Sequence, residues 1–422
     1  MPQIRSRVWL LVACVFTVAL ILSAHTWGFR LTFLDDNEIV RGRAEWLAKA
    51  SSFADSFTHR YFLSDVNLYY RPLVNLSFAV DAHLGGSNPW VYHFTNGVLH
   101  ASASTLLLLS MLRMGIDPGS ALAACALFIV NPMQVASVAW IPGRNDLLLG
   151  CFAFGALIFL AQRGQRWWST LGHGLCFFGA LLCKETALCL PAVFALYLGA
   201  RDGLSKLLRN RGIGLAWGLP VIGYFGLRHR IIEMPSEYAF HLVKSALQHP
   251  GVLISDFGKV VLPVHLQVIA TARDIDVRLG GVALTVMATV IFLLRRHLRV
   301  PAVMLACALV TMPLFMAFLA SDFIALENRL YLPIAGMSLL CAECLHAIQP
   351  QKRTARIVTL AAGAGVALAF ATAAFRYSSQ FSDRHRFSAA AIQASPHSYL
   401  AIWLNAQPSL HTPSGPARAK KK

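Results

Sequence analysis

Runs of about twenty mostly apolar residues recur along almost the whole chain, and they constrain its fold more than any other feature. The first run, 8–28, is nearly free of charge. A helix of about 20 apolar residues is long enough to cross the hydrocarbon core of a bilayer. Only 14% of the 422 residues are charged, whereas soluble domains have about 25%. The sequence therefore predicts an all-α polytopic membrane protein.

The apolar runs predict about eleven transmembrane helices. They lie roughly at 8–28, 91–112, 118–139, 147–162, 170–183, 186–200, 213–227, 279–294, 300–319, 331–348 and 357–375. Lys and Arg collect in cytoplasmic loops, so Arg5 and Arg7 should hold the N-terminus in the cytoplasm. No small-residue cleavage site follows the first run, which we interpret as a retained span. The net charge of +17 has the same topogenic explanation, and no basic soluble face suggests a nucleic-acid partner.

Two long segments fall on the outer side under this topology. The first, 29–90, mixes charges of both signs with aromatic residues, which is typical of a folded loop with interfacial amphipathic helices. The second, 228–278, contains the apolar stretch 251–270, which carries Asp256 and Lys259. We expect this stretch not to cross, because a crossing would move two later basic loops to the outer side.

One membrane domain, 1–378, therefore takes up most of the chain. The remainder, 379–422, is predicted to be a short tail that is helical and then disordered. Its closing residues, ARAKKK, would lie outside, against the charge bias, and favour one more crossing. No other targeting signal is evident, so we expect a bacterial inner membrane, with membrane lipid as a neighbour throughout.

Four polar clusters lie at span ends on the predicted outer face. They are FLDDNE, WIPGRND, LLCKET and LENRLYLP, and they contain Asp35, Asp36, Arg144, Asp146, Lys184, Glu185, Glu327 and Arg329. These groups are explained either as solvated span-end charges and topogenic ion pairs or as a reaction site. A carboxylate at the surface can take a proton from a hydroxyl, while Arg and Lys hold a phosphate. The second explanation suits transfer of a group from a lipid phosphate to a hydroxyl.

A second polar set lies inside the span 91–112. His93, Asn96 and His100 are spaced by three and four residues, which puts them on one helix face. In hydrocarbon that face must turn toward a cavity or a partner helix. Interhelical hydrogen bonds and a substrate contact both explain it. A metal site is not favoured, because two turns separate the histidines and no third ligand is apparent.

At these residues the sequence resembles the GT-C superfamily of membrane glycosyltransferases. Within it, the chain is most similar to the O-mannosyltransferase-like proteins that carry C-terminal tetratricopeptide repeats, and to their bacterial relatives. The resemblance covers most of 30–340. It is carried, in order, by FLDDNE, YYRPLVNLSFAVD, YHFTNGVLH, NPMQVASVAWIPGRNDLL, LLCKETALCLPA and ENRLYLP.

The resemblance implies a GT-C-like bundle and a sugar donor carried on a polyprenyl phosphate. By that match Asp35 is the general base and Asp36 helps to position it, at a site that faces the periplasm. The implied contacts to the donor phosphate are Arg329, Lys184 and Arg144, and the further candidate substrate contacts are Arg71, His93, Glu185, Asp146, Glu327 and Tyr331. The acceptor would be a hydroxyl of a protein or a surface glycan, with inversion at the sugar. No metal or other cofactor is expected, although the two aspartates could hold a divalent cation.

The chain also departs from the family pattern. Relatives have HPLHVESVAW where this chain has NPMQVASVAW, so Asn131, Gln134 and Ala136 replace two His and a Glu. The repeats are missing, apart from a stretch near 387–405 that is similar to the start of one. These departures leave two rivals: a catalytically inactive scaffold that binds the lipid donor, and a transporter or flippase for a lipid-linked sugar. A transporter more often shows two matching halves, and the sequence has no internal repeat.

Overall fold

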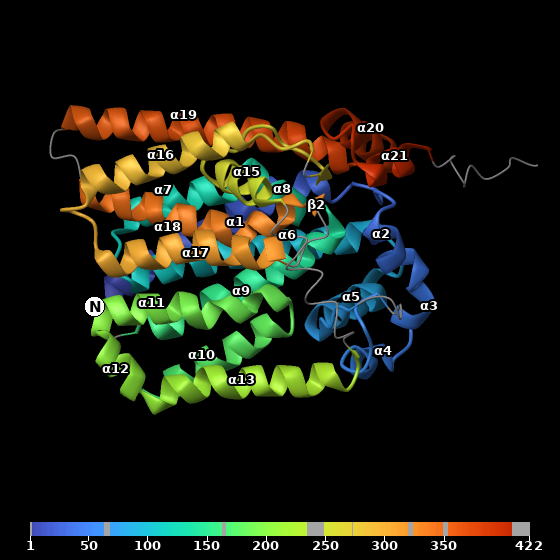
Figure 1. Cartoon of the computed structure of the whole chain (residues 1–422), viewed down its shortest axis with the longest axis horizontal. Helices are drawn as coiled ribbons and strands as arrows, with labels where there is room; N and C mark the ends of the chain where they lie inside the picture. Colours follow the sequence, from blue (N-terminus) through green and yellow to red (C-terminus); the bar gives the residue numbers. More distant parts are fainter. Residues whose placement is uncertain are drawn as a thin grey trace, which may run out of the picture.

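Long helices dominate the structure, a computed structural model of the chain. It describes residues 2–62, 68–162, 166–233, 249–271, 273–319, 324–348 and 353–406. The helices lie side by side, roughly along the horizontal direction of Figure 1. The connections between them gather at the two ends of this bundle, so each end is a surface built from several loops.

The long helices coincide with the predicted apolar runs. They are α1 (Pro2–Ser23), α6 (Pro89–Arg113), α7 (Pro118–Ile129), α9 (Arg144–Leu160), α10 (Trp167–Leu181), α11 (Leu190–Asp202), α13 (Arg211–His229), α16 (Val277–Leu294), α17 (Val300–Leu319), α18 (Tyr331–Ile348) and α19 (Arg353–Ser378). Two of them begin at a proline that follows a capping side chain: Asn88 accepts from the amide of Trp90, and Asp117 accepts from the amide of Ser120. Proline is favoured at a first helical position because its missing N–H would have no partner there.

Six helices in the described part of the chain are long and apolar enough to cross a membrane, or seven if one bent pair counts as a span. The chain is therefore an integral membrane protein. The expectation of about eleven spans is not confirmed. Helices α10 and α11 have 15 and 13 residues, which at about 1.5 Å per residue gives about 22 and 20 Å, short of a core of about 30 Å. Helix α17 counts as a shorter apolar helix, because the segment that was found to be apolar is Val300–Met316.

The bent pair interrupts the predicted span 118–139. Helix α7 ends at Ile129, and η3 (Pro132–Gln134) and α8 (Val135–Val138) continue at an angle of 53°. Asn131 has an extended backbone, with φ −64° and ψ 125°. A residue before proline is disfavoured in the helical region, and proline itself cannot donate to the preceding turn. The Asn131–Pro132 pair therefore breaks the helix inside an otherwise apolar run.

The predicted first outer loop folds into short helices at the right-hand end of the bundle in Figure 1. They are α2 (Asp35–Asn37), η2 (Glu38–Gly42), α3 (Ala44–Leu47), α4 (Ser52–Asp55) and α5 (Pro72–Gly85). Their apolar side chains form a cluster of their own, which Ile141 and Cys183 join from the starts and ends of membrane helices. The loop is therefore anchored to the bundle by burial of apolar surface.

The predicted second outer segment contains α15 (Pro250–Val261) and β1 (Ala270–Thr271), and 234–248 lies outside the described residues. Twelve residues of α-helix extend about 18 Å, too short to cross. Strand β1 pairs antiparallel with β2 (Ile324–Ala325). The tail contains η7 (Ser379–Phe381), α20 (Arg384–Ala394) and α21 (Tyr399–Ala406). The predicted disorder of its last residues lies outside the described part of the chain.

Candidate functional site

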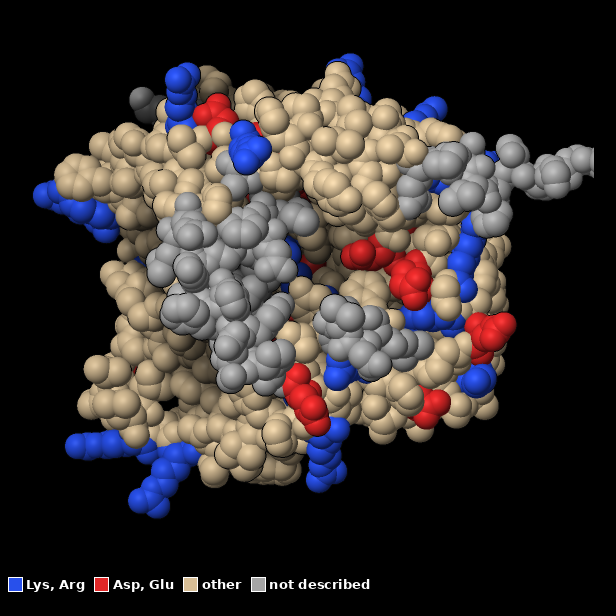
Figure 2. All heavy atoms as spheres, turned by 45° about the vertical axis from the view of Figure 1, so that its right-hand side comes forward, with Lys and Arg blue, Asp and Glu red and all other residues tan. Residues whose placement is uncertain are grey.

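The predicted polar clusters lie at the end of the bundle where α2–α5 pack. Figure 2 turns this end forward and shows acidic and basic side chains gathered around a hollow in the surface. The first turn of α9 and the connections next to α1, α10 and α18 supply these groups. The site is therefore assembled from span ends that are far apart in the sequence.

Asp35 and Asp36 begin helix α2 and differ in their surroundings. Asp36 is 1% exposed, and its Oδ2 accepts from the amide of Thr32 at 2.6 Å and from the Thr32 hydroxyl at 2.9 Å. Within the described residues no hydrogen bond reaches the Asp35 carboxylate, which is half-buried. Burial, reinforced by the charge of Asp36 and opposed by Arg71, raises the pKa of Asp35 to about 6. A carboxyl group in this state can accept a proton near neutral pH.

Arg71 is the cation whose charge acts on Asp35. Its Nε and Nη2 donate to Oε2 of Glu185 at 3.2 and 2.9 Å. The guanidinium also lies over the ring of Tyr69, with Cζ 4.3 Å from the centroid. Burial opposes its charge, but Glu185 and the two nearby tyrosines raise the pKa of Arg71 above its ordinary value. Arg71 is therefore a permanently charged group held in one orientation beside Asp35.

Lys184 and Asp146 form a second ion pair in the same region. The ammonium of Lys184 lies 2.6 Å from each carboxylate oxygen of Asp146. Asn328 donates to Oδ2 of Asp146 at 2.8 Å. Burial lowers the pKa of Lys184 to about 8, with Asp146 opposing the shift and Arg71 and Arg329 adding to it. Lys184, Arg71 and Arg329 are thus close enough for their positive charges to repel one another. An anion bound among them would relieve this repulsion, so the arrangement suits an anionic ligand.

Arg329 is half-buried beside these groups on η6 (Glu327–Leu330). Its electrostatic neighbours are Tyr69, Asp256, Asp146 and Arg71. Asp256 comes from α15, and burial, opposed by Lys259 and Arg329, raises its pKa to about 6. Helix α15 therefore contributes a carboxyl group to the site from the second outer segment.

Glu327 precedes Arg329 by two residues but is tied into the fold. Its carboxylate accepts from Lys259 at 3.0 Å, from the amide of Gln267 at 2.8 Å and from the hydroxyl of Tyr377 at 2.6 Å. These contacts join η6 to α15 and α19. Glu327 is 3% exposed, and both of its carboxylate oxygens have a hydrogen-bond partner. Its contacts therefore hold the fold together.

Arg144 also lies apart from the cation group, although the sequence placed it among the phosphate contacts. It is fully buried and forms an ion pair of 2.5 Å with Asp81. Its other donors reach the Asn96 side chain and the Tyr92 carbonyl, both at 2.8 Å. The guanidinium of Arg144 bonds to groups on α5 and α6 and so joins these helices to α9. It has no exposed face for a phosphate.

The polar face of α6 serves packing in part. Asn96 holds Arg144, and Nδ1 of His100 lies 3.0 Å from the hydroxyl of buried Tyr331. His93 is 2% exposed, and neither of its ring nitrogens has a hydrogen-bond partner in the described structure. His100 and Tyr331 therefore face each other inside the bundle, while His93 stays a candidate substrate contact.

The structure thus brings together Asp35, Asp36, Arg71, Asp146, Lys184, Glu185 and Arg329. Arg144, Glu327 and Tyr331 are instead bonded to other parts of the fold. His93 lies on the buried face of α6 without a hydrogen-bond partner among the described residues. The sequence did not place Asp256, Asn328 or Tyr69 in the site. A signal for Asp256 existed, because an acid in an apolar stretch is a functional candidate. Nothing in the sequence marks Asn328 or Tyr69 beyond their place beside the motif residues Arg329 and Arg71.

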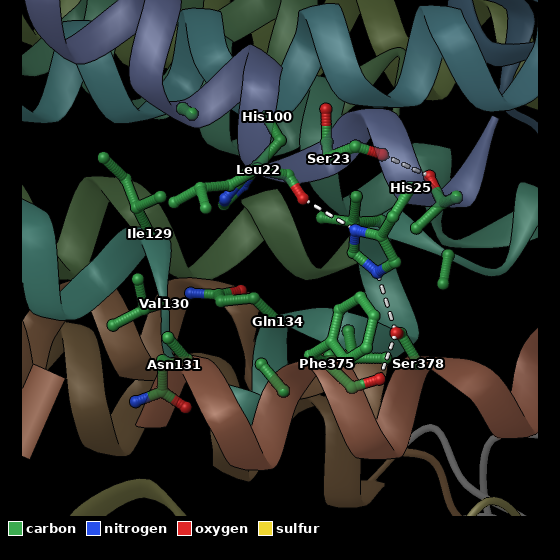
Figure 3. A pocket seen from close by; sticks show the side chains of 17 residues that line it. Leu22, Ser23, His25, His100, Ile129, Val130, Asn131, Gln134, Phe375 and Ser378 are labelled. Carbon is green, nitrogen blue, oxygen red and sulfur yellow. Dashed lines mark hydrogen bonds between the residues drawn. The ribbon is translucent and has the colours of Figure 1, made fainter. Parts of the chain in front are cut away.

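The residues that depart from the family pattern lie behind this site. Asn131 and Gln134 line a cavity of about 100 Å³ between α1, the α7 bend and α19 (Figure 3). Neither amide atom of buried Gln134 has a hydrogen-bond partner there among the described residues. Ala136 is buried in an apolar cluster that Leu34, the neighbour of Asp35, packs against. The replaced Glu position therefore belongs to the apolar cluster against which the Asp35 loop packs.

Within the described residues no three His, Cys, Asp or Glu side chains converge as metal ligands. Asp35 and Asp36 supply two carboxylates, one of which is already bonded to Thr32. A divalent cation at this pair stays an untested alternative.

Comparison with known proteins identifies relatives by sequence. Protein O-mannosyl-transferase TMTC2 of Homo sapiens is 35% identical over 172 residues, which are 37% of this chain and 20% of that protein. Tmtc2 of Drosophila melanogaster is 31% identical over 202 residues, 44% of this chain and 21% of that protein. TMTC4 of Mus musculus is 30% identical over 244 residues, 49% of this chain and 32% of that protein. The family resemblance inferred from the motifs is confirmed.

These matches span a fifth to a third of the relatives' own length. No family model matches the chain. No solved structure matches it either. The three relatives are eukaryotic, so a bacterial inner membrane stays a prediction from the sequence.

Proposed function

We propose, from the similarity to protein O-mannosyl-transferases, that this chain is a membrane glycosyltransferase that modifies a hydroxyl group of a protein. The donor is a sugar on a polyprenyl phosphate, and the first sugar to test is mannose, because the relatives' names specify it. A glycan hydroxyl is the alternative acceptor. The reaction takes place at the end of the bundle that carries Asp35, where the phosphate of a lipid embedded in the bilayer can reach.

The observation that carries this proposal is the pairing of an unbonded carboxylate with a buried group of cations. The Asp35 carboxylate has no hydrogen bond within the described residues, and Arg71, Lys184 and Arg329 act on one another's charge nearby. A general base needs a free carboxylate, and a departing phosphate needs preorganised positive charge. A site for topology alone would need neither arrangement.

The proposed step is a single displacement. Asp35 takes the proton of the acceptor hydroxyl while the acceptor oxygen forms a bond to the anomeric carbon. The bond from that carbon to the phosphate oxygen breaks, and its electron pair leaves with the polyprenyl phosphate. Arg71, Lys184 and Arg329 stabilise the added negative charge on the phosphate. One displacement at the anomeric carbon inverts its configuration.

The test uses the full chain in nanodiscs with radiolabelled polyprenyl-phosphate mannose and other lipid-linked sugars. Asp35→Asn should abolish loss of lipid-linked label and leave donor binding within about threefold, because the base acts in the transition state and not in donor binding. The control is Asp55→Asn, a partly exposed acid of the same loop on α4, which should keep wild-type turnover.

Each rival function has its own signature in this experiment. Donor binding without turnover in the wild-type chain supports the inactive scaffold. Movement of intact lipid-linked sugar across sealed vesicles supports the transporter. Turnover that survives in Asp35→Asn contradicts the assignment of the base.

A further inference from the structure

The end of the bundle opposite Asp35 has a cavity of its own, of about 560 Å³. Four parts of the chain that are far apart in the sequence build it: the end of α6, the connection from α9 to α10, the end of α11 and the connection from α16 to α17. Its charged and aromatic lining residues are Arg113, Arg166, Arg201, Arg299, Trp168 and Tyr197. No acidic residue is among the described residues that line it. We call this feature the arginine cavity.

Two of the four arginines are held in place by the protein. Arg299 donates from Nε to Glu343 at 3.0 Å and from Nη1 to the Met114 carbonyl at 3.0 Å. Arg201 pairs with Asp202 at 2.6 Å and donates to the Leu160 carbonyl at 2.9 Å. Their positions are therefore fixed before any ligand arrives, and one carboxylate balances each charge.

The other two arginines leave the cavity with an excess of positive charge. Arg113 and Arg166 are both exposed, and no hydrogen bond or ion pair to the described residues uses either guanidinium. With two charges balanced and two unbalanced, the cavity has a net positive charge of about two, and it suits a ligand with one or two negative charges.

A topological role alone does not explain this convergence. Arginine at one end of a membrane helix fixes its orientation wherever it lies on that end. Arg209 and Arg296 do so at the same end, exposed and outside the cavity. The four cavity arginines instead meet around one hollow together with two aromatic rings, and Arg201 lies 5.2 Å from the Tyr197 centroid.

The aromatic residues indicate the depth of the cavity. Trp167 and Trp168 are 78% and 40% exposed on the helix that starts at the cavity, α10. Tryptophan is enriched where a membrane protein passes the lipid headgroups. The cavity therefore opens at the level where lipid phosphates lie.

We propose that the arginine cavity binds the phosphate group of an anionic phospholipid headgroup. The planar fork of arginine matches phosphate oxygens with two parallel hydrogen bonds, and basic pockets between membrane helices are suited to such headgroups. A soluble phosphate compound would offer the same group from the aqueous side. This inference does not depend on the proposed transferase reaction, since it concerns the opposite end of the molecule.

The test measures binding of short-chain dihexanoyl phosphatidylglycerol to the full chain in detergent, by native mass spectrometry and by the shift in melting temperature. Arg113→Gln/Arg166→Gln should weaken binding about tenfold or more, because each arginine near a lipid headgroup contributes about a factor of five. The matched control, Arg209→Gln/Arg296→Gln, removes the same charge outside the cavity and should bind within about twofold of wild type. Dihexanoyl phosphatidylcholine, which has no net charge, should bind wild type weakly.

Competition with inorganic phosphate separates the two sources of the ligand. Displacement of the lipid only by large excess phosphate supports a headgroup site, and displacement at equal concentration points to a soluble phosphate compound. If the double variant does not fold, Arg113→Lys/Arg166→Lys keeps the charge but loses the fork, and it should still weaken binding. Equal binding by wild type and both variants, or equal binding of the two lipids, overturns the proposal.

Discussion

At the scale of single residues, hydrogen bonding distinguishes the two neighbouring carboxylates of the site, those of Asp35 and Asp36. Asp35 and Asp36 are adjacent, yet the Asp36 carboxylate accepts two hydrogen bonds from Thr32, while the Asp35 carboxylate has none within the described residues. The bonded carboxylate orients the loop, and the unbonded one is available for proton transfer. The two arginines differ in their partners: Arg71 pairs with Glu185 beside Asp35, whereas the fully buried Arg144 pairs with Asp81.

The pKa values of Asp35 and Lys184 predict the dependence of turnover on pH. Asp35 must be ionised to act as a base, so kcat/KM should rise as pH increases through about 6. Lys184 must be protonated to stabilise phosphate, so activity should fall as pH increases through about 8. The measurement is kcat/KM from pH 5 to pH 9. A profile that is flat across this range would rule out both groups, and Lys184→Arg should remove only the alkaline limb.

The Arg144–Asp81 pair should matter for stability more than for chemistry. Asp81→Asn leaves a fully buried guanidinium without its carboxylate, and breaking such a pair typically costs about 3–5 kcal/mol. We expect a large drop in melting temperature in detergent. The control is Asp202→Asn, whose pair with Arg201 is partly exposed and should be worth at most about 1 kcal/mol. Normal stability with lost donor binding in Asp81→Asn would instead place Arg144 in the donor site.

At the scale of elements, helix α15 connects the second outer segment to the site. It carries Asp256 toward Arg329, and its Lys259 bonds Glu327 on η6. It can lie this close to α16 because two glycines meet there. A Cβ on Gly258 would lie 2.7 Å from the backbone nitrogen of Gly280, which is closer than packed atoms approach.

Gly280→Ala should therefore displace α15. A Cβ on Gly280 would collide with the carbonyl oxygen of Ile254, a backbone atom that cannot move aside without the helix. We expect lower turnover together with a lower melting temperature. The neighbouring Gly281 has open space where its Cβ would lie, so Gly281→Ala should be neutral or stabilising by up to about 1 kcal/mol. If both variants behave alike, close packing of α15 on α16 is not required for the site.

At the scale of the whole molecule, the bundle has two different ends. One end carries Asp35 with the outer-loop helices, and the other carries the arginine cavity. Loops rich in Arg and Lys are expected in the cytoplasm. The charge distribution thus predicts that the two sites face opposite sides of the membrane.

Cysteine labelling tests this sidedness. Lys49→Cys places a thiol on the exposed outer loop, and Arg296→Cys places one at the opposite end. A membrane-impermeant maleimide should label the first in intact cells and the second only after permeabilisation. The parent chain, with its nine native cysteines, provides the background. Labelling of both positions in intact cells would contradict the topology.

The sequence by itself determined the membrane class, the positions of most long helices and the resemblance to the O-mannosyltransferase-like proteins. These follow from local properties, because apolar length, loop charge and short motifs can be read within a window of some twenty residues. It also identified most of the charged residues of the site.

Only the tertiary structure decided which charges are partners. Asp146 meets Lys184 and Asn328, and Arg144 meets Asp81, because helices far apart in the chain pack side by side. Motif order could not separate Arg144 from Lys184, since both lie at span ends within two residues of an acid. Burial and partners distinguish the roles of Arg144 and Lys184. Both depend on which helix ends meet in the folded chain. The arginine cavity exists for the same reason: four separate parts of the chain meet only once the bundle has formed.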